Sequence, residues 1–222
     1  MTIMPSSSTA GPLTAKTADM DTYFYDPREG HGLPHDPFKA ILAPRPIGWI
    51  SSLDAAGRVN LAPYSFFNGF NSNPPIVGFS SEGRKDSVSN IEQTGEFVCN
   101  LATRDLAEAM NRTSAPAPRG VNEMTLAGLE AAPSTRVRPP RVAKSPAALE
   151  CRLLQIVPLH DLEGASVGAY LVLGQVIGVH IDLAYLKDGR FDTAAAQPIA
   201  RCGYRGDYAE LGRMFEMIRP TS

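Results

Sequence analysis

The run Arg84–Ser87 opens a predicted helix and holds residue types that could bind an anion. Val88 and Ile91 have the spacing of a helix face that turns toward a core. The helix start would bring together two cations, the Ser87 hydroxyl and free backbone N–H groups, and such groups bind phosphate. The charge of Asp86 opposes an anion there. The alternative interpretation is an ordinary capped helix on the surface.

A second candidate for ligand binding is the segment Asn60–Asn68. It interleaves hydroxyl and amide groups with aromatic side chains directly after a predicted strand, and Pro63 ends the hydrogen-bond ladder of that strand. A planar, partly polar ligand such as a flavin needs an apolar slot and donors along one ring edge. This composition supplies both. The alternative is that Phe66 and Phe67 pack in the core.

Two further patterns lack the context that their chemistry needs. Gly164–Gly168 matches the G-x-S-x-G motif of hydrolases, which requires a strand before the serine and a helix after it. Here the serine follows a polar loop and His160, and it precedes a predicted strand, so we interpret the glycines as part of a hairpin loop. His31 and His35 have the spacing of metal ligands on a helix, but a glycine and a proline between them forbid the helix. No metal site is predicted.

The composition is that of a globular chain without a surplus of either charge. The chain has 222 residues, of which 43% are hydrophobic, so one domain with its own core is expected. Because 21 Lys and Arg stand against 23 Asp and Glu, nucleic acid is not an expected partner. The three cysteines show neither a disulfide nor a zinc pattern, which favours the reducing cytoplasm.

The chain is expected to consist of a tail and one domain. Residues 1–20 are rich in Pro, Gly and Ser and predict a disordered N-terminal tail, and residues 21–222 form the domain. The longest apolar stretch, residues 167–181, is interrupted by polar side chains and is too short for a helix across about 30 Å of hydrocarbon. No membrane span is therefore expected.

The elements that would position these groups are mainly short strands, because 19 prolines and 19 glycines leave little room for long helices. The predicted strands are 47–53 and 59–62, which form a hairpin through the turn 54–57, and 76–80, 97–101, 149–153 and 170–179. Helices are predicted at 86–94, with Asp86 as N-cap and Gly95 beyond the end, at 104–111 and at 208–217.

Two of these strands carry a burial pattern. Leu149, Cys151 and Leu153 alternate with Glu150 and Arg152, which predicts one buried and one solvated face. The strand 170–179 is apolar on both faces, which places it in a barrel centre or under a partner subunit. The overall prediction is a β-barrel with helices against it.

Together these motifs resemble the flavin reductase-like, FMN-binding split-barrel family. The resemblance covers residues 38–218 and rests on five ordered motifs and on the later runs Pro198–Arg201 and Asp207–Tyr208. The five motifs are Arg45–Ser52, Gly57–Ser65, Asn73–Gly78, Lys85–Ile91 and Gly95–Asn100. The resemblance implies a mainly β fold with short helices, a six-stranded antiparallel split barrel, and a homodimer that binds FMN noncovalently near the subunit interface.

The resemblance also implies the residues of the FMN site. Ser51, Ser52, Ala62, Pro63 and Tyr64 would line the isoalloxazine and the ribityl chain. Ser65, Lys85 and Ser87 would hold the phosphate, in agreement with the anion site predicted above. Arg45 or Arg201 would place a cation near flavin N1, although either arginine could instead pair with a carboxylate in a structural role.

The function that the resemblance implies is an oxidoreductase that transfers hydride from NADH or NADPH to flavin. Hydride transfer requires no acid or base from a side chain, so no catalytic residue is predicted. Typical members carry a Gly-Asp-His segment before the strand that corresponds to 170–179, and residues 163–170 lack that histidine. The alternative is therefore an electron-transfer protein whose FMN is reduced by a protein partner. A monooxygenase or another redox protein is the expected partner, and haem storage is disfavoured because no axial ligand is evident.

Overall fold

The computed structural model describes residues 22–220 of the chain. It divides into two units, with the boundary between Pro37 and Phe38. The described part of the first unit, residues 22–37, forms turns without a helix or strand, and a hydrogen-bonded pair with Arg28 lowers the pKa of Asp26 to about 2. The tail predicted for residues 1–20 lies outside the described residues. The second unit begins at Phe38. The predicted domain boundary at residue 21 stays a prediction.

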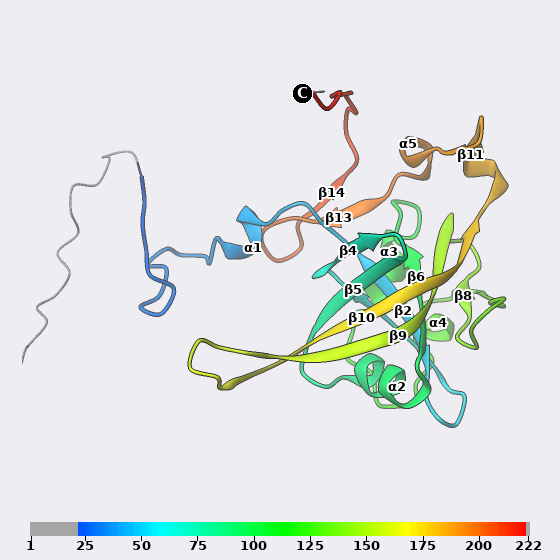
Figure 1. Cartoon of the computed structure of the whole chain (residues 1–222), viewed down its shortest axis with the longest axis horizontal. Coiled ribbons are helices and arrows are strands. Elements are labelled where there is room, and N and C mark those ends of the chain that lie inside the picture. Colours follow the sequence, from blue (N-terminus) through cyan, green and yellow to red (C-terminus); the bar gives the residue numbers. More distant parts are fainter. Residues whose placement is uncertain (1–21, 221–222) are drawn as a thin grey trace, which may run out of the picture. The chain divides into compact units, whose positions relative to one another are not determined.

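A seven-stranded, fully antiparallel sheet forms the body of the second unit (Figure 1). Its strands, in spatial order, are β3 (Val59–Tyr64), β2 (Gly48–Leu53), β6 (Glu96–Leu101), β9 (Ala147–His160), β10 (Ser166–Ile181), β5 (Pro75–Glu82) and β4 (Phe67–Ser72). The mainly β antiparallel fold is as predicted, but the sheet has seven strands rather than six. The extra edge strand β4 begins at Phe67, within the segment Asn60–Asn68, and pairs with β5.

Smaller elements surround this sheet. A three-stranded sheet joins β1 (Arg45–Pro46), β13 (Ile199–Arg201) and β14 (Tyr208–Glu210), and two two-stranded pairs join β7 (Ala131–Ala132) to β8 (Arg141–Val142) and β11 (Leu186–Lys187) to β12 (Arg190–Phe191). The helices are α1 (Phe38–Ile41), α2 (Asp86–Thr94), α3 (Ala107–Arg112), α4 (Glu123–Leu126) and α5 (Thr193–Ala196), with a 3-10 turn at Leu183–Tyr185. No helix among the described residues is long and apolar enough to span a membrane.

The hairpin β2–β3 forms where the sequence predicts it. The Asp54 carboxylate accepts hydrogen bonds from the N–H groups of Ala56 and Arg58, both at 2.9 Å, and so closes the turn. Gly57 adopts a φ of +79°, a conformation that a side chain would strain. The turn fixes the register that pairs Trp49 with Pro63.

Strand β2 separates two core clusters, because its neighbouring side chains point to opposite faces. Ile50 joins Phe79, Phe97 and other buried side chains inside the curled sheet, whereas Trp49 joins a cluster on the outer face. Helix α2 closes the inner cluster with Val88 and Ile91, and α3 and α4 cover the outer one. Strand β2 is thus held on both sides, and it pairs with β3, the strand whose end forms part of the candidate site.

Helix α2 has the predicted bounds, and Gly95 ends it in the left-handed conformation with a φ of 72°. The N-cap, however, is Lys85 and not Asp86. The second predicted helix is shorter than expected, because α3 begins at Ala107 after a turn at Thr103–Leu106. The third is wrong: Tyr208–Glu210 pairs with β13 as β14, and residues 211–220 have no regular structure.

The prediction of a solvated face for Glu150 is wrong. Its side chain is fully buried, because its carboxylate accepts hydrogen bonds from the backbone N–H groups of Thr135 and Val137, at 2.8 and 2.9 Å, and contacts His180. Arg152, in contrast, is exposed as predicted. Burial acts to raise the pKa of Glu150, but the hydrogen bonds outweigh burial and the pKa is lowered.

Strand β10 is buried on one face only within this chain. Val172 and Val176 are buried, whereas Leu171 and Leu173 on the opposite face are half-buried and Val179 is exposed. Of the two predicted positions for this strand, a barrel centre that buries both faces is not formed within the chain, and coverage by a partner subunit stays a prediction. Figure 1 shows β9 and β10 extending as a long two-stranded ribbon beyond the rest of the sheet.

The serine of the G-x-S-x-G pattern lies at the turn of this ribbon. Ser166 starts β10, is exposed, and accepts a hydrogen bond from the N–H of Gly168 at 3.2 Å. It has strands on both sides, as the hairpin interpretation predicts.

Candidate functional site

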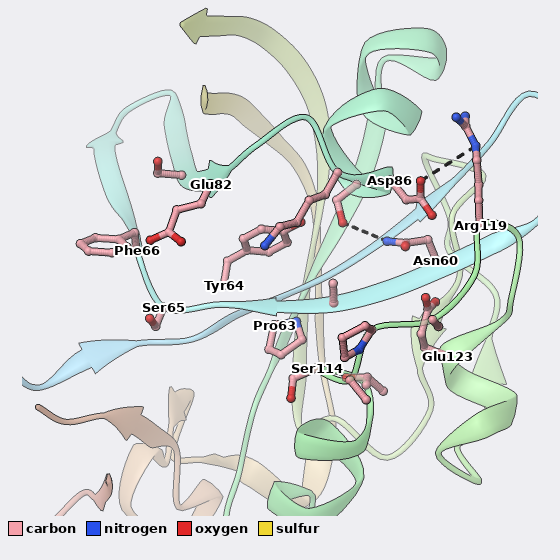
Figure 2. A pocket seen from close by; sticks show the side chains of 18 of the residues that line it. Asn60, Pro63, Tyr64, Ser65, Phe66, Glu82, Asp86, Ser114, Arg119 and Glu123 are labelled. Atoms are coloured by element: carbon pink, nitrogen blue, oxygen red, sulfur yellow. Dashed lines mark hydrogen bonds and ion pairs between the residues drawn. The ribbon is translucent and has the colours of Figure 1, made fainter. Parts of the chain in front are cut away.

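A cavity of about 550 Å³ lies between the end of β3, the start of α2 and the loop 113–119 (Figure 2). Six of the residues predicted to bind FMN line it: Ala62, Pro63, Tyr64, Ser65, Lys85 and Ser87. They come from two segments that the sequence separates by some twenty positions. The hairpin β2–β3 and the packing of α2 on β2 and β3 bring these segments together.

The start of α2 leaves donors available to the cavity. Lys85, the N-cap residue, makes no side-chain hydrogen bond to the first turn, so no side chain caps the N–H groups there. The Ser87 hydroxyl is buried at 1% exposure and accepts a hydrogen bond from the Asn60 amide at 2.9 Å. Tyr64 is buried beside it, and burial raises the pKa of its phenol. These contacts hold Ser87 in place at the cavity wall.

The cavity wall carries three cationic and three anionic side chains, so its charges balance. The cations are Lys39, Lys85 and Arg119, and the anions are Glu82, Asp86 and Glu123. Lys39 pairs with Glu82 at 3.7 Å, and Arg119 pairs with Asp86 at 3.9 Å. The third cation, Lys85, has no carboxylate oxygen of the described residues within 4.0 Å of its ammonium group. Its charge is therefore available to a ligand.

Glu123 is a buried carboxylate in the wall that the sequence did not reveal. Its side chain is 8% exposed and accepts a hydrogen bond from the N–H of Leu61 at 2.9 Å. Burial raises its pKa, and the charge of Asp86 adds to the effect. The side chain of Asn122 caps α4 and so fixes the position of Glu123. The Asn-Glu pair signals a helix start, but nothing in it indicates that the carboxylate faces a cavity.

The other part of the wall that the sequence did not reveal is the loop after α3. Thr113, Ser114, Ala115, Pro116 and Ala117 contribute to the cavity. Thr113 also accepts a hydrogen bond from the Trp49 indole at 2.9 Å, which ties the loop to the core. A run of small residues and prolines predicts a loop, but it does not say what the loop covers.

Ser51 and Ser52 do not line the cavity. Both are fully buried, because β2 is covered on both faces. The Ser51 hydroxyl donates to the carbonyl of Pro140 at 2.6 Å, and the Ser52 hydroxyl accepts from the Asn90 amide at 3.3 Å. Their partners are thus protein groups.

The two arginines predicted near the flavin also lie outside this wall. Arg45 is buried, and its guanidinium donates to the carbonyls of Lys39 and Cys202. Arg201 is its partner across the β1–β13 pair and lines a neighbouring cavity. Neither pairs with a carboxylate within the described residues, so the structural ion pair considered above is not formed there.

Comparison with known proteins identifies the family. Residues 42–195 match the flavin reductase like domain. An uncharacterized protein of Deinococcus radiodurans is 38% identical over 195 residues, which are 82% of this chain and 82% of the relative. The chain belongs to the flavin reductase-like family.

Two solved structures share the fold. Component B of nitrilotriacetate monooxygenase from Bacillus cereus is 30% identical with a TM-score of 0.80, over 88% of this chain and 98% of that one. An FMN-binding domain of a flavin reductase-like enzyme from Shewanella baltica is 20% identical with a TM-score of 0.65, over 78% of this chain and 89% of that one. The predicted split-barrel fold is confirmed.

Proposed function

We propose that this protein binds FMN noncovalently in the cavity at the start of α2 and is an oxidoreductase that transfers hydride from NADH or NADPH to flavin. The observation that carries the proposal is the uncapped start of α2, where Lys85 without a carboxylate partner faces an apolar strand end. A helix start with a free cation favours a phosphate group. Membership of the flavin reductase-like family supports the choice of ligand.

The cavity has the size and the groups that FMN requires. Its volume of about 550 Å³ lies within the usual range for cofactor sites of about 300–1,000 Å³. Ala62, Pro63 and Tyr64 offer apolar surface to the ring system. Ser65, Lys85 and the buried start of α2 at Ser87 offer donors to the phosphate.

The redox chemistry belongs to the cofactor, whose flavin ring accepts and passes on a hydride equivalent. The residues of the chain bind it, orient it and keep water away from it. Lys85 supplies the positive charge, and the loop 113–117 covers the side of the cavity opposite α2. Ser51 and Ser52, whose hydroxyls are engaged elsewhere, act in this proposal only by holding β2 in place.

The proposal includes a homodimer. The ribbon β9–β10 exposes Leu154, Leu162 and Val167, and the final segment exposes Phe215 and Ile218. Large apolar side chains exposed on the ribbon, and separately on the final segment, favour an interface with a second copy. Light scattering of the purified protein at low micromolar concentration should give the mass of two chains, and the mass of one chain would refute this part.

The experiment for the reaction uses the FMN-loaded protein without oxygen. On mixing with NADH or NADPH, the flavin absorbance should bleach within seconds, since enzymes typically turn over about 1 to 1,000 times per second. Ser166→Ala is the control and should leave the rate unchanged, because this serine lies at an exposed turn.

The second candidate is an FMN-bearing electron carrier that a protein partner reduces, and the missing histidine in residues 163–170 favours it. Prompt bleaching by dithionite, with neither nicotinamide effective over many minutes, would replace the reductase proposal by this one. The partner would then be a monooxygenase or another redox protein.

A further inference from the structure

A second cavity of about 500 Å³ adjoins the proposed flavin site. The two cavities share Pro63, Ser65 and Ser114, and Figure 2 shows Pro63 and Ser114 near each other on the wall of the first. The second cavity is lined by Arg201 and Arg205, and no acidic side chain is among its lining residues. The first cavity balances three cations with three anions, so the two cavities differ in their charge.

The carboxylates nearest in sequence do not neutralise these arginines. Glu210 pairs with Arg104 at 2.7 Å, and the Asp207 carboxylate accepts from the N–H of Tyr204 at 3.2 Å. Among residues 22–220, the hydrogen-bond acceptor of the Arg201 guanidinium is the backbone carbonyl of Asp207, at 3.4 Å. Its guanidinium lies over the ring of Tyr208 with 4.6 Å to the ring centroid, which keeps the cation in place without cancelling its charge.

A third arginine, on the neighbouring strand, adds to this positive charge. Arg45 lies opposite Arg201 in the β1–β13 pair and is 6% exposed. Its Nε is buried and has no hydrogen-bond partner in the described part of the chain. Among the buried side-chain nitrogen and oxygen atoms of residues 22–220, this one alone lacks a partner. Burial and the charge of Arg201 both lower the pKa of Arg45. Protein interiors rarely leave adjacent guanidinium groups without an anion, because their repulsion and desolvation then have no compensation.

The rest of the lining defines the kind of anion. Ile47, Pro63 and Met110 provide an apolar wall, and Ser65 and Asn111 provide uncharged polar groups. Guanidinium groups bind planar carboxylates and phosphates through paired hydrogen bonds. A small molecule with an apolar body and one oxyanion group matches this combination.

We propose that the cavity of Arg201 and Arg205 binds the oxyanion group of a second small ligand, next to the flavin. The position beside a flavin rests on the proposed function, whereas anion binding by the arginines does not. Carboxylates of organic acids and phosphates of a nucleotide share the required chemistry. The wall of Pro63 and Ser65, common to both cavities, places this ligand against the end of the flavin site.

The test is calorimetric titration of the protein, with and without FMN, using benzoate as the carboxylate probe and NADP⁺ as the phosphate probe. At least one probe should bind, and Arg201→Gln with Arg205→Gln should weaken it about 10- to 100-fold, the range for losing hydrogen bonds to a charged group. The control Arg213→Gln removes the same charge from an exposed position outside the cavity and should have no effect. Binding of benzoate alone would assign the site to organic acids, and binding of NADP⁺ alone would assign it to the electron donor.

Three results would overturn the proposal. The first is that neither probe binds the wild-type protein at millimolar concentration. The second is that the arginine variants bind the probe as the wild type does. The third is that the arginine variants lose FMN affinity, since the arginines would then serve the flavin itself. Arg205→Gln alone, at an exposed side chain, keeps the test valid if the Arg201 variant fails to fold. Failure of FMN binding in all proteins would refute the proposed function and leave the titration without FMN as the test of this site.

Discussion

Replacing Glu123 by glutamine should tighten FMN binding. The carboxylate faces the same cavity as Lys85, so its charge opposes a phosphate held at the start of α2. Glutamine keeps the shape of the side chain and the acceptor oxygen for the N–H of Leu61, which lies at 2.9 Å. The substitution therefore removes a charge with little change in the structure. Because burial already disfavours the charged form of Glu123, stability at neutral pH should not fall.

The size of the cavity sets the magnitude. A sphere of about 550 Å³ is about 10 Å across, and two unit charges about 10 Å apart at an effective dielectric constant of about 20 repel by about 1.7 kcal/mol. Salt and the open side of the cavity reduce this value. The expected gain in FMN affinity is therefore about 3- to 15-fold.

The pH dependence follows from the raised pKa of Glu123. At a pH below that pKa the carboxyl is neutral and does not repel the phosphate. As the pH rises through it, the carboxylate forms and FMN affinity falls. The phosphate of FMN loses its second proton near pH 6, and the added charge is repelled by Glu123 in the wild type but not by glutamine in the variant. The ratio of the two affinities should therefore grow as the pH rises.

The assay is titration of FMN fluorescence with apoprotein at several pH values between about 5 and 8, on both sides of the phosphate pKa near 6. Glu82→Gln is the matched control, because Glu82 also lines the cavity but is exposed and pairs with Lys39 at 3.7 Å. It should change affinity much less. Riboflavin, which has no phosphate, should bind the wild type and Glu123→Gln with equal affinity. Equal or weaker FMN binding by folded Glu123→Gln at neutral pH would refute the reasoning.

Two further predictions concern stability. Glu150→Gln should lower the free energy of unfolding by about 2–4 kcal/mol in urea titrations, because a buried carboxylate with several hydrogen bonds loses its charge, and a loss below about 0.5 kcal/mol would contradict this. The pKa of Glu150 is lowered by folding, so its contribution is present above the ordinary pKa of 4.5 and is lost as the pH falls through the lowered value. Gly174→Ala should lower the free energy of unfolding by about 1–3 kcal/mol, because the new methyl group would clash with the buried ring of Phe97. Gly69→Ala is the control and should lower it clearly less, because the space around Gly69 is open. Equal losses in the two glycine variants, measured by thermal unfolding, would show that the clash is relieved at no cost.

Local signals predicted the elements that local interactions determine. The turn at Asp54 and Gly57 and the end of α2 at Gly95 depend on residues a few positions apart, so the sequence is sufficient to place them. The helix at 208–217 was wrong because Tyr208 pairs with Arg201 across a sheet, and such pairing overrides helix propensity. The prediction of a solvated Glu150 was wrong because the N–H groups that bind its carboxylate come from a loop some 15 residues away in the sequence.

The candidate site shows the same division. The start of α2 and the end of β3 were predicted as ligand-binding segments because cations and a hydroxyl at a helix start indicate anion binding, and polar groups among aromatic side chains indicate a planar ligand. Glu123 and Arg205 were not, since an acidic residue at a helix start and a lone arginine in a loop look like solvated surface until tertiary contacts place them. Arg201 was expected near the flavin, but its place in a second cavity was not. Ser51 and Ser52 were expected at the flavin, and only the coverage of β2 on both faces shows why their hydroxyls turn to protein partners.

The most direct test of the central claim is the affinity of the apoprotein for FMN compared with riboflavin, measured by calorimetric titration of the wild type and of Lys85→Ala. The wild type should bind FMN more tightly by about 10- to 100-fold, because only FMN carries the phosphate that Lys85 and the start of α2 hold. Lys85→Ala should lose most of this preference while its affinity for riboflavin stays the same. Equal affinity of the wild type for the two flavins, or an unchanged preference in Lys85→Ala, would contradict the assignment of this cavity as the FMN site.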